Sequence, residues 1–284
     1  MNAPDSSGPD LYAVFGNPIA HSKSPRIHAL FAAQTDQHLV YEKRLAPLDG
    51  FAASVQEFIA AGGRGANVTV PFKLQAHDLA DTLAPRAQAA GAVNTLIFAD
   101  GQVYGDNTDG QGLVSDIVHR AGQPINGQRV LVLGAGGATR GALLPLLEQR
   151  PQQLTLANRT LSTAQELLTQ FSAQFPEAGR GVTLHACGLS DIQGQFDLVI
   201  NATSASLQAA IPPIPENCFA NGALAYDMVY GKELTPFLQY AQQHGARARD
   251  GLGMLVEQAA LAFFLWRKVK PDSDAVYHTL LSEL

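Results

Sequence analysis

A lysine occupies a position that helix electrostatics disfavours, and it is the first candidate for chemistry in this sequence. The chain from Gly62 to Lys73 runs from a glycine-rich loop into a strand predicted for Asn67–Val70, which Pro71 ends. Lys73 then falls in the first turn of the next helix, where the positive end of the helix dipole disfavours a cation. A solvated surface lysine is the ordinary interpretation of such a residue. A functional ammonium group, with Thr69 close to it at the end of the strand, is the alternative.

Oxygen-bearing side chains follow the first predicted strand. An apolar run predicts that strand over Leu11–Phe15, and Gly16-Asn17-Pro18 closes it. Ser22 lies in the loop beyond, and the C-terminal ends of strands are where open α/β sheets bind ligands. Ser24 precedes Pro25 and is expected to cap a short helix, a role that would account for it without any ligand.

A second polar loop extends from Gly105 to Gly110, with the sequence Gly-Asp-Asn-Thr-Asp-Gly. It follows a hairpin turn predicted at Asp100-Gly101. Thr108 or Asp109 is expected to cap the helix predicted for Leu113–His119. No further acid arrives at the spacing of an EF-hand, which argues against a calcium loop.

A short apolar run, Val130–Leu133, ends in glycines and continues into a helix-forming segment. Gly134 would form the tight turn after a buried parallel strand, and Gly136 would let the backbone approach a pyrophosphate. The free N–H groups of the following helix would face that pyrophosphate. Thr139 stands where the third glycine of G-x-G-x-x-G is expected, so an ordinary glycine-rich turn is the alternative to a dinucleotide site.

The end of the next predicted strand, Leu154–Ala157, distinguishes between two cofactors. Domains that bind NAD have Asp or Glu there, which holds the ribose hydroxyls. This chain has Asn158-Arg159-Thr160 instead. A guanidinium without that acid suits a 2′-phosphate, so the sequence favours NADP over NAD. Thr160 is also a candidate cap for the helix that begins there.

Strands and helices alternate after the glycine turn. Further strands are predicted for Val182–Ala186 and Asp197–Asn201. The alternation is typical of a doubly wound parallel sheet, so the predicted fold class is α/β. A long apolar helix opens at Gly251 and contains the amide Gln258, which either satisfies a buried backbone group or binds a ligand hydroxyl.

Composition limits the class of protein. The 284 residues and the 46% hydrophobic content are enough for two domains with their own cores. A net charge of -6 argues against a nucleic-acid or anionic-membrane surface. The two cysteines, Cys187 and Cys218, are far apart, which favours a reducing, cytoplasmic location. The histidines form no zinc motif, so no metal is expected.

Taken in order, the motifs of the chain resemble those of the shikimate dehydrogenase family, nearly from end to end. In the first half the matching segments are Gly16-Asn17-Pro18 with Ser22 and Ser24, Asn67–Lys73, Gly91–Thr95 and Gly105–Gly110. In the second half they are Gly134–Ala138, Asn158–Thr160, Asn201–Ser204, Tyr226–Met228 and Gly251–Met254. Any single match could be chance, whereas the ordered set is highly specific.

The resemblance implies a reversible, NADPH-dependent reduction of 3-dehydroshikimate to shikimate, in the pathway to aromatic amino acids. It implies a substrate-binding domain of residues 1–109 and 251–284, a Rossmann-type NADP-binding domain of residues 110–250, and C-terminal helices that pack back on the first domain. Lys73 and Asp109 would be the catalytic pair. Substrate contacts are implied for Ser22, Ser24, Thr69, Lys73, Asn94, Asp109, Tyr230 and Gln258. Cofactor contacts are implied for Gly134, Ala135, Gly136, Gly137, Ala138, Asn158, Arg159, Thr160, Thr163, Met228 and Gly251.

Two other functions stay open at this point. A quinate or dual quinate/shikimate dehydrogenase would share nearly all these residues. A non-catalytic NADP-sensing module is disfavoured, since it would need neither Lys73 nor Asp109. The family commonly has a second arginine where this chain has Thr163, so selectivity for NADP is expected to be less strict. The expected partner is a small-molecule substrate, without nucleic acid or membrane, and a homodimer is left open.

Overall fold

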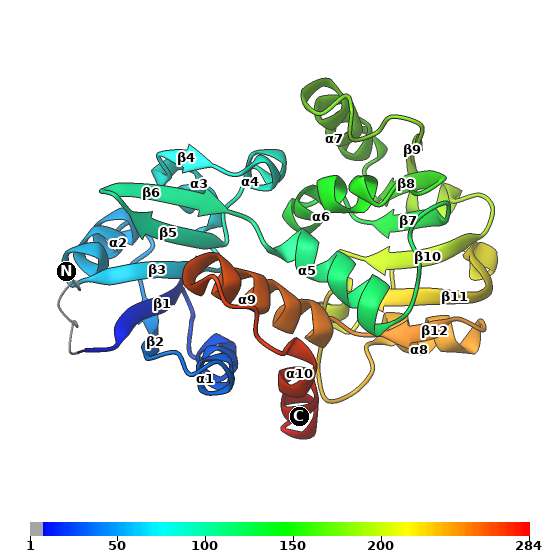
Figure 1. Cartoon of the computed structure of the whole chain (residues 1–284). Helices are drawn as coiled ribbons and strands as arrows, with labels where there is room; N and C mark the ends of the chain where they lie inside the picture. Colours follow the sequence, from blue (N-terminus) through cyan, green and yellow to red (C-terminus); the bar gives the residue numbers. More distant parts are fainter. Residues whose placement is uncertain (1–7) are drawn as a thin grey trace. The chain divides into compact units, whose positions relative to one another are not determined.

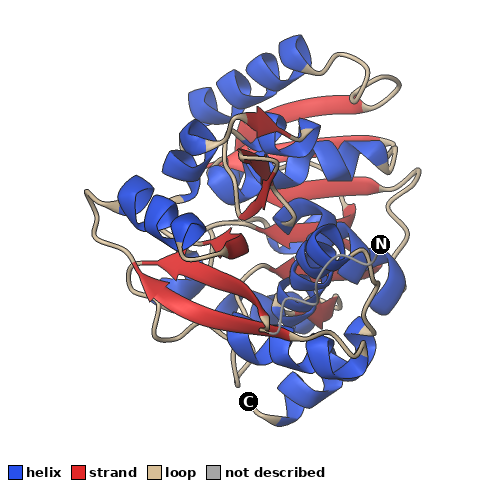
Figure 2. Cartoon of the chain, turned by 60° about the vertical axis from the view of Figure 1, so that its left-hand side comes forward, coloured by secondary structure: helices blue, strands red, loops and turns tan. Residues whose placement is uncertain are grey.

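The computed structural model describes residues 8–284, and its strands form two six-stranded sheets (Figure 1). The chain divides into two compact units. Unit 1 comprises the residues up to Thr108 together with Ala259–His278, and unit 2 comprises Asp109–Gln258 together with Thr279–Leu284. Helices flank both sheets, which confirms the α/β class (Figure 2). The assignment of a substrate domain and an NADP domain to particular residue ranges stays a prediction.

Unit 1 contains a mixed sheet. Its strands, in sheet order, are β2 (Leu39–Leu45), β1 (Asp10–Gly16), β3 (Gly63–Val68), β5 (Thr95–Ala99), β6 (Gln102–Asp106) and β4 (Thr82–Leu83). Its helices are α1 (Ser24–Gln34), α2 (Phe51–Ala60), α3 (Lys73–Leu79), α4 (Pro85–Ala90), and the parts of α9 (Leu252–Arg267) and α10 (Ser273–Ser282) between Ala259 and His278. Strand β5 runs antiparallel to both β3 and β6. The predicted hairpin turn at Asp100-Gly101 is confirmed, with φ of 54° and 73° at the two residues.

Alternation along β1 directs side chains to helices on both faces of this sheet. Phe15 contacts Phe58 of α2, with ring centroids 5.6 Å apart. Tyr12 points to the opposite face and contacts Trp266 of α9, with ring centroids 4.8 Å apart. The indole N–H of Trp266 donates to the carbonyl of Leu96 in β5 at 3.0 Å. The C-terminal part of α9 therefore packs on the first sheet, as the resemblance implied.

Unit 2 contains a sheet of six parallel strands. In sheet order they are β12 (Arg247–Arg249), β11 (Phe219–Asp227), β10 (Phe196–Asn201), β7 (Arg129–Leu133), β8 (Gln153–Asn158) and β9 (Thr183–Gly188). Its α- and π-helices are α5 (Asp109–Ser115), the π-helical turn η1 (Asp116–Arg120), α6 (Gly137–Glu148), α7 (Leu161–Gln174), α8 (Pro236–Gln243), α9 up to Gln258 and the end of α10 from Thr279. The order of strands reverses between β7 and β10, which confirms the doubly wound arrangement. Sheets of this kind bind ligands at the C-terminal strand ends beside that reversal.

Two helix starts differ from prediction. Ser24 is the first residue of α1 and Lys23 occupies the N-cap position, so the predicted capping role of Ser24 is wrong. Lys23 already has helical backbone angles, with φ of -87° and ψ of -7°, which places Ser24 inside the helix. Helix α5 begins at Asp109, well before the predicted Leu113, because its early glycines pack closely against neighbouring helices instead of forming a loop.

Candidate active site

The loops after β1 and β3 of unit 1 are bonded to each other at the C-terminal ends of their strands. The N–H of Thr69 donates to the Phe15 carbonyl at 2.9 Å, and the N–H of Asn17 donates to the Val70 carbonyl at 3.1 Å. A β-carbon on Gly16 would lie 2.6 Å from Cγ2 of Thr69, so the two loops need a glycine at this contact. Strand β3 spans Gly63–Val68, so it both begins and ends earlier than the predicted Asn67–Val70.

Ser22 and Ser24, both predicted substrate contacts, lie together in the loop after β1 and the start of α1. The hydroxyl of Ser22 accepts the Ser24 N–H at 3.3 Å, which links the loop to the first residue of α1. Ser24 is buried and bonded to the hydroxyl of Tyr41 in β2. Burial raises the pKa of Tyr41 well above its usual value, against the smaller effect of that bond to Ser24.

Lys73 is the first residue of α3, which confirms its predicted place in the first turn. No side chain caps this helix, and the residue before it is Phe72. The backbone carbonyl of Lys73 accepts the Val93 N–H at 2.9 Å, which fixes the start of α3 beside Asn94. The Lys73 side chain is half-buried. The backbone of Lys73 is therefore fixed shortly after the C-terminal end of β3, beside the predicted substrate contact Asn94.

Asn94 is a buried side chain that joins the start of β5 to the residue before Asp109. Its Oδ1 accepts the Thr108 N–H at 2.9 Å and the Thr95 hydroxyl at 2.8 Å, and its Nδ2 donates to the Thr108 hydroxyl at 3.0 Å. Asn67, which the sequence reasoning missed, donates to the Thr95 hydroxyl at 3.1 Å. A polar residue inside an otherwise buried strand was the available signal for Asn67. Asn94 is thus held in one orientation by its neighbours.

Two of the three predicted substrate contacts of unit 2, Asp109 and Gln258, lie at helix positions with little free space. Asp109 is the first residue of α5 and is half-buried. Gln258 of α9 is buried, and its Nε2 donates to the Leu255 carbonyl at 2.7 Å. The prediction that Gln258 bonds to a backbone group is therefore confirmed. A β-carbon on Gly112 would lie 2.6 Å from the Gln258 backbone nitrogen, so α5 and α9 touch through backbone at this point.

Three predicted residues of unit 2 come together after β11. The N–H of Met228 donates to the Asn201 carbonyl at 3.1 Å, and the N–H of Gly251 donates to the Val229 carbonyl at 3.2 Å. A β-carbon on Gly251 would overlap the Met228 carbonyl, so only glycine permits this contact. Tyr230 follows in the same loop, and burial raises the pKa of its hydroxyl, with Asp250 acting in the same direction.

The glycine turn between β7 and α6 has the backbone shape predicted for it. Gly134 has φ of +98°, and its N–H donates to the Ala157 carbonyl at 2.8 Å. β-Carbons on Gly136 and Gly137 would meet no atom within 4 Å, so the backbone there is open to a ligand. No side chain caps α6, which leaves its first-turn N–H groups for an anion. The residues present fit a pyrophosphate.

Thr139 explains why this turn lacks the third glycine. Its hydroxyl donates to the Gly134 carbonyl at 2.7 Å, and the residue is completely buried. The turn is therefore closed by a side-chain bond that a glycine could not make. Sequence reasoning identified the substitution but had no local rule for this bond.

The segment after β8 has an exposed guanidinium beside the glycine turn, because β7 and β8 are adjacent parallel strands. Arg159 is exposed, and no acidic side chain of the described residues pairs with it. The amide of Asn158 donates to the Thr160 carbonyl at 2.9 Å. Thr160 occupies the N-cap position of α7, but its side chain makes no capping bond. Thr163 is exposed in the first turn of α7. An unpaired arginine at this strand end fits a 2′-phosphate.

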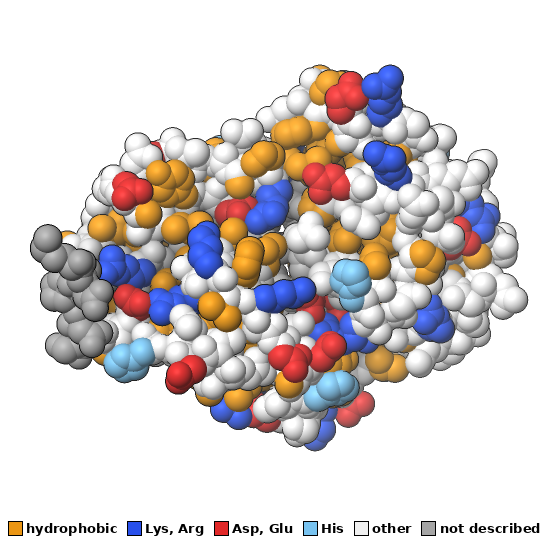
Figure 3. Space-filling view, viewed as in Figure 1, with side chains coloured by type: hydrophobic (Ala, Val, Ile, Leu, Met, Phe, Trp, Pro, Cys, Tyr) orange, Lys and Arg blue, Asp and Glu red, His pale blue; other side chains and the backbone are white. Residues whose placement is uncertain are grey.

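The described residues show neither a basic surface on the face drawn nor a membrane-spanning helix nor a metal cluster. On the face drawn in Figure 3, basic and acidic side chains are interspersed, with no continuous basic area. Within residues 8–284, no helix has both the length and the apolar character to cross a membrane. The same residues contain no group of three or more His, Cys, Asp or Glu side chains that could hold a metal ion.

Three family models match the chain. The model described as "Shikimate dehydrogenase substrate binding domain" matches residues 14–96. The model "Shikimate / quinate 5-dehydrogenase" matches residues 116–211, and "Shikimate 5'-dehydrogenase C-terminal domain" matches residues 251–281. The matched ranges include segments of both units.

Similar proteins align with the chain over nearly its whole length. A protein of Janthinobacterium sp. (strain Marseille) named shikimate dehydrogenase (NADP(+)) is 57% identical over 279 residues, covering 98% of this chain and 100% of the relative. The solved structure of an Ael1 enzyme from Pseudomonas putida is 48% identical, with a TM-score of 0.89, and covers 95% of this chain and 98% of that one. Shikimate 5-dehydrogenase from Thermus thermophilus, solved with NADP(H) and shikimate, is 32% identical, with a TM-score of 0.81, and covers 97% of this chain and 100% of that one.

Proposed function

The chain belongs to the shikimate dehydrogenase family, and we propose that it catalyses the reversible NADPH-dependent reduction of 3-dehydroshikimate to shikimate. It is an NADP-dependent oxidoreductase that acts on a CH–OH group. The observation that supports this reaction most directly is Lys73, whose place at the start of α3 is fixed by the backbone bond to Val93. This fixes the backbone of a lysine shortly after the C-terminal end of β3.

We assign Lys73 and Asp109 the proton chemistry of this reaction. NADPH, when bound, supplies a hydride to the ketone carbon. Negative charge then develops on the carbonyl oxygen, where the Lys73 ammonium stabilises it and gives it a proton. The neutral amine recovers its proton from water, and the reverse reaction removes the proton from the substrate hydroxyl. Asp109 would accept a hydrogen bond from that hydroxyl.

The remaining polar side chains suit a substrate with one carboxylate and several ring hydroxyls. We assign the carboxylate to the hydroxyls of Ser22 and Ser24, which lie together and are held by their own bonds. The amides of Asn94 and Gln258, with Thr69, would bind ring hydroxyls. Tyr230 is the further substrate contact that we propose in unit 2. Side chains that are already fixed lose little conformational freedom when the substrate binds.

The cofactor assignment rests on two features of unit 2. The open backbone of the segment Gly134–Ala138 and the uncapped start of α6 would bind the pyrophosphate. Arg159, assisted by the donors of Asn158 and Thr160, would bind the 2′-phosphate. Met228 and Gly251 would contact the nicotinamide end. Thr163 stands in place of a second arginine, so we expect the preference for NADP over NAD to be moderate.

A quinate or dual quinate/shikimate dehydrogenase is the second candidate, because one matching family model is named for both substrates. Steady-state kinetics with shikimate and quinate, each with NADP+ and NAD+, would distinguish the two. We expect the highest kcat/KM for shikimate with NADP+. A higher value for quinate would overturn the proposed substrate, and a lack of turnover with every pair would favour an NADP-sensing module.

Two finer properties are also proposed. We place the protein in the cytoplasm, because its two cysteines are free, buried thiols, and burial raises the pKa of Cys218 to about 11. Thiols of this kind suit a reducing compartment. We keep a homodimer as a proposal, and light scattering after gel filtration, at several protein concentrations, tests it.

A further inference from the structure

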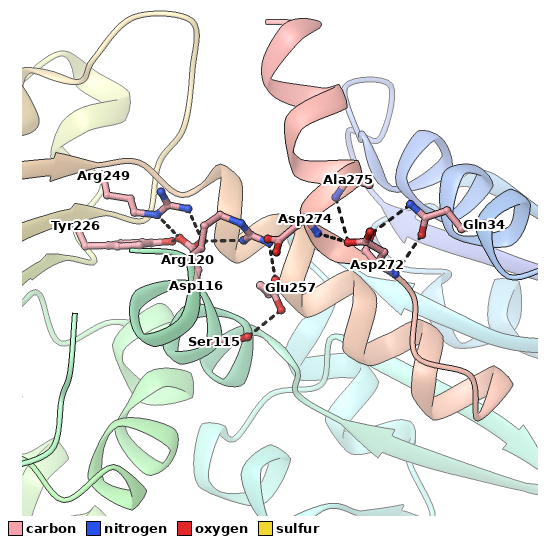
Figure 4. Close-up of polar contacts among 10 residues, drawn as sticks. All are labelled: Gln34, Ser115, Asp116, Arg120, Tyr226, Arg249, Glu257, Asp272, Asp274 and Ala275. Atoms are coloured by element: carbon pink, nitrogen blue, oxygen red, sulfur yellow. Dashed lines mark hydrogen bonds and ion pairs between the residues drawn. The ribbon is translucent and has the colours of Figure 1, made fainter. Parts of the chain in front are cut away.

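A buried carboxylate outside the proposed catalytic residues has four hydrogen bonds from three donors. Asp116, the first residue of the π-helical turn after α5, is completely buried. Arg249 of β12 donates to its two oxygens at 2.8 and 2.6 Å. The Tyr226 hydroxyl of β11 donates at 2.9 Å, and Arg120 donates at 2.9 Å. Figure 4 shows the three side chains pointing toward this carboxylate.

The same cluster reaches helix α9 through a second carboxylate. Glu257 of α9 accepts from Arg120 at 2.8 Å and from the Ser115 hydroxyl at 2.8 Å (Figure 4). Arg120 therefore bridges Asp116 and Glu257. The cluster joins four elements of unit 2: the end of α5 with η1, strands β11 and β12, and the first turns of α9. All the side chains in it are at least mostly buried.

Glycines bring the same two helices into backbone contact. A β-carbon on Gly253 of α9 would overlap the Asp116 carboxylate, so the carboxylate lies directly on the helix surface. A β-carbon on Gly112 of α5 would lie 2.6 Å from the backbone nitrogen of Gln258. The ionic cluster and the glycine contacts lie on one seam, which leaves α5 and α9 little room to slide.

Two of the residues that we propose to contact the substrate, Asp109 and Gln258, lie along this seam. Asp109 precedes Asp116 by about two helical turns, so both project from roughly the same side of the helix. Gln258 follows Glu257 directly in α9. A shift of α5 along α9 would therefore displace the Asp109 carboxylate and the Gln258 amide relative to each other. Reaction rates fall steeply when catalytic groups are misplaced by as little as 1 Å.

We propose that Asp116 is a positioning residue, which Arg249 and Tyr226 hold so that it fixes α5 on α9 and thereby sets the positions of Asp109 and Gln258. This inference rests on the proposed function, because it uses the roles assigned to those two residues. The buried tyrosine is part of the device: burial, followed by the Asp116 charge, raises the pKa of Tyr226 well above its usual value, so its hydroxyl stays a donor. The glycine turn and Arg159, the proposed phosphate contacts, lie outside the cluster, so the part of the NADP affinity that comes from the phosphates should be insensitive to it.

The test measures kinetics, cofactor affinity and stability in two variants. In Asp116→Asn, one acceptor oxygen becomes a donor facing the guanidinium groups. We expect kcat for shikimate oxidation to fall about tenfold and KM for shikimate to rise, at 25 °C. The Kd for NADP+ should stay within a factor of two. Tyr226→Phe removes a single hydroxyl and should show the same pattern, to a smaller degree.

Asp197→Asn is the matched control. Asp197 receives a bidentate bond from Arg129 in the same unit, at 3.0 and 2.9 Å, where β10 and β7 begin. We expect this variant to lower Tm and to leave kcat and KM unchanged. If Asp116→Asn does not fold, the kinetics of Tyr226→Phe test the inference. Variants that lose thermal stability but keep wild-type kcat and KM would overturn the inference. A wild-type protein without turnover would instead overturn the proposed function.

Discussion

Gly110 of α5 and Gly141 of α6 meet through their backbones: a β-carbon on Gly110 would overlap the Gly141 carbonyl oxygen. Both glycines are buried in unit 2. Gly110 directly follows the proposed catalytic Asp109, and α6 begins at the turn proposed to bind the pyrophosphate. This contact therefore fixes the proposed catalytic carboxylate relative to the helix that would hold the cofactor.

Substitution at this contact tests its importance. Gly110→Ala forces α5 away from α6, because the obstacle is a backbone oxygen that cannot rotate aside. We expect a loss of about 1–3 kcal/mol in the free energy of unfolding and a fall of at least about tenfold in kcat. Thermal unfolding and steady-state kinetics measure the two effects. Gly179→Ala is the control, since its β-carbon would meet only the flexible end of Leu184, at 3.3 Å. Wild-type behaviour of Gly110→Ala would show that the helices can separate without cost.

Much of the fold was predictable from local sequence. The apolar run before Gly134, the hairpin at Asp100-Gly101 and the alternation of strands and helices all have short-range causes, and the structure confirms them. Helix ends were less predictable. The glycines of α5 favoured a loop by local rules, yet Gly110 is helical because tertiary packing there requires a residue without a side chain.

The site was predictable where its residues form compact motifs, and not where they meet only in the fold. The position of Lys73 in a first turn and the unpaired Arg159 both follow from neighbouring residues. The Asp116 cluster does not, since Tyr226 and Arg249 lie more than 100 residues further along the chain. Nothing in the local sequence distinguishes these two from ordinary strand residues.

Removal of the Lys73 ammonium group tests the proposed proton transfer. In Lys73→Ala no group at the start of α3 can stabilise or protonate the developing oxyanion. We expect kcat to fall about 1,000-fold, with KM for shikimate changed only a few-fold. Stopped-flow or steady-state absorbance of NADPH measures both constants. Lys270→Ala, at an exposed position of unit 1, is the control for loss of a positive charge. Full activity of Lys73→Ala would contradict the proposed role of Lys73 in proton transfer.

The role of Arg159 is tested by comparing the two nicotinamide cofactors. Arg159→Ala deletes the guanidinium proposed to bind the 2′-phosphate, a group that NAD lacks. A charge-assisted hydrogen bond of this kind contributes about 1.5–3 kcal/mol, so we expect KM for NADP+ to rise at least about tenfold. KM for NAD+ should change less than twofold. Arg180→Ala is the control, because Arg180 is exposed and pairs with Glu177. Equal changes in the two Michaelis constants would contradict the cofactor assignment.

A buried imidazole in unit 1 predicts a dependence of stability on pH. His28 of α1 is completely buried, and its ring stacks on Tyr41 with centroids 4.3 Å apart. The rings of Phe263 and Trp266 lie 6.1 and 5.2 Å away. Neither ring nitrogen has a hydrogen-bond partner among the described residues. Burial lowers the pKa of His28 from 6.5 to about 3. The nearby Asn67 side chain, which does not reach hydrogen-bonding geometry with the ring, raises this pKa by a smaller amount.

Because the pKa of His28 is lower in the folded than in the unfolded chain, acid favours unfolding. Below pH 6.5 the unfolded chain binds a proton at His28, whereas the folded chain binds it only near pH 3. The stabilising effect of the neutral ring is therefore complete above pH 6.5 and is lost as the pH falls toward 3. At pH 5 this single residue should lower the free energy of unfolding by about 2 kcal/mol relative to pH 8. His28→Phe keeps an aromatic ring without a titrating group, so the difference between the two pH values should shrink by that amount in denaturant titrations. His38→Gln, at an exposed position, should keep the wild-type difference. An unchanged pH dependence in His28→Phe would mean that His28 has the same pKa in the folded and the unfolded chain.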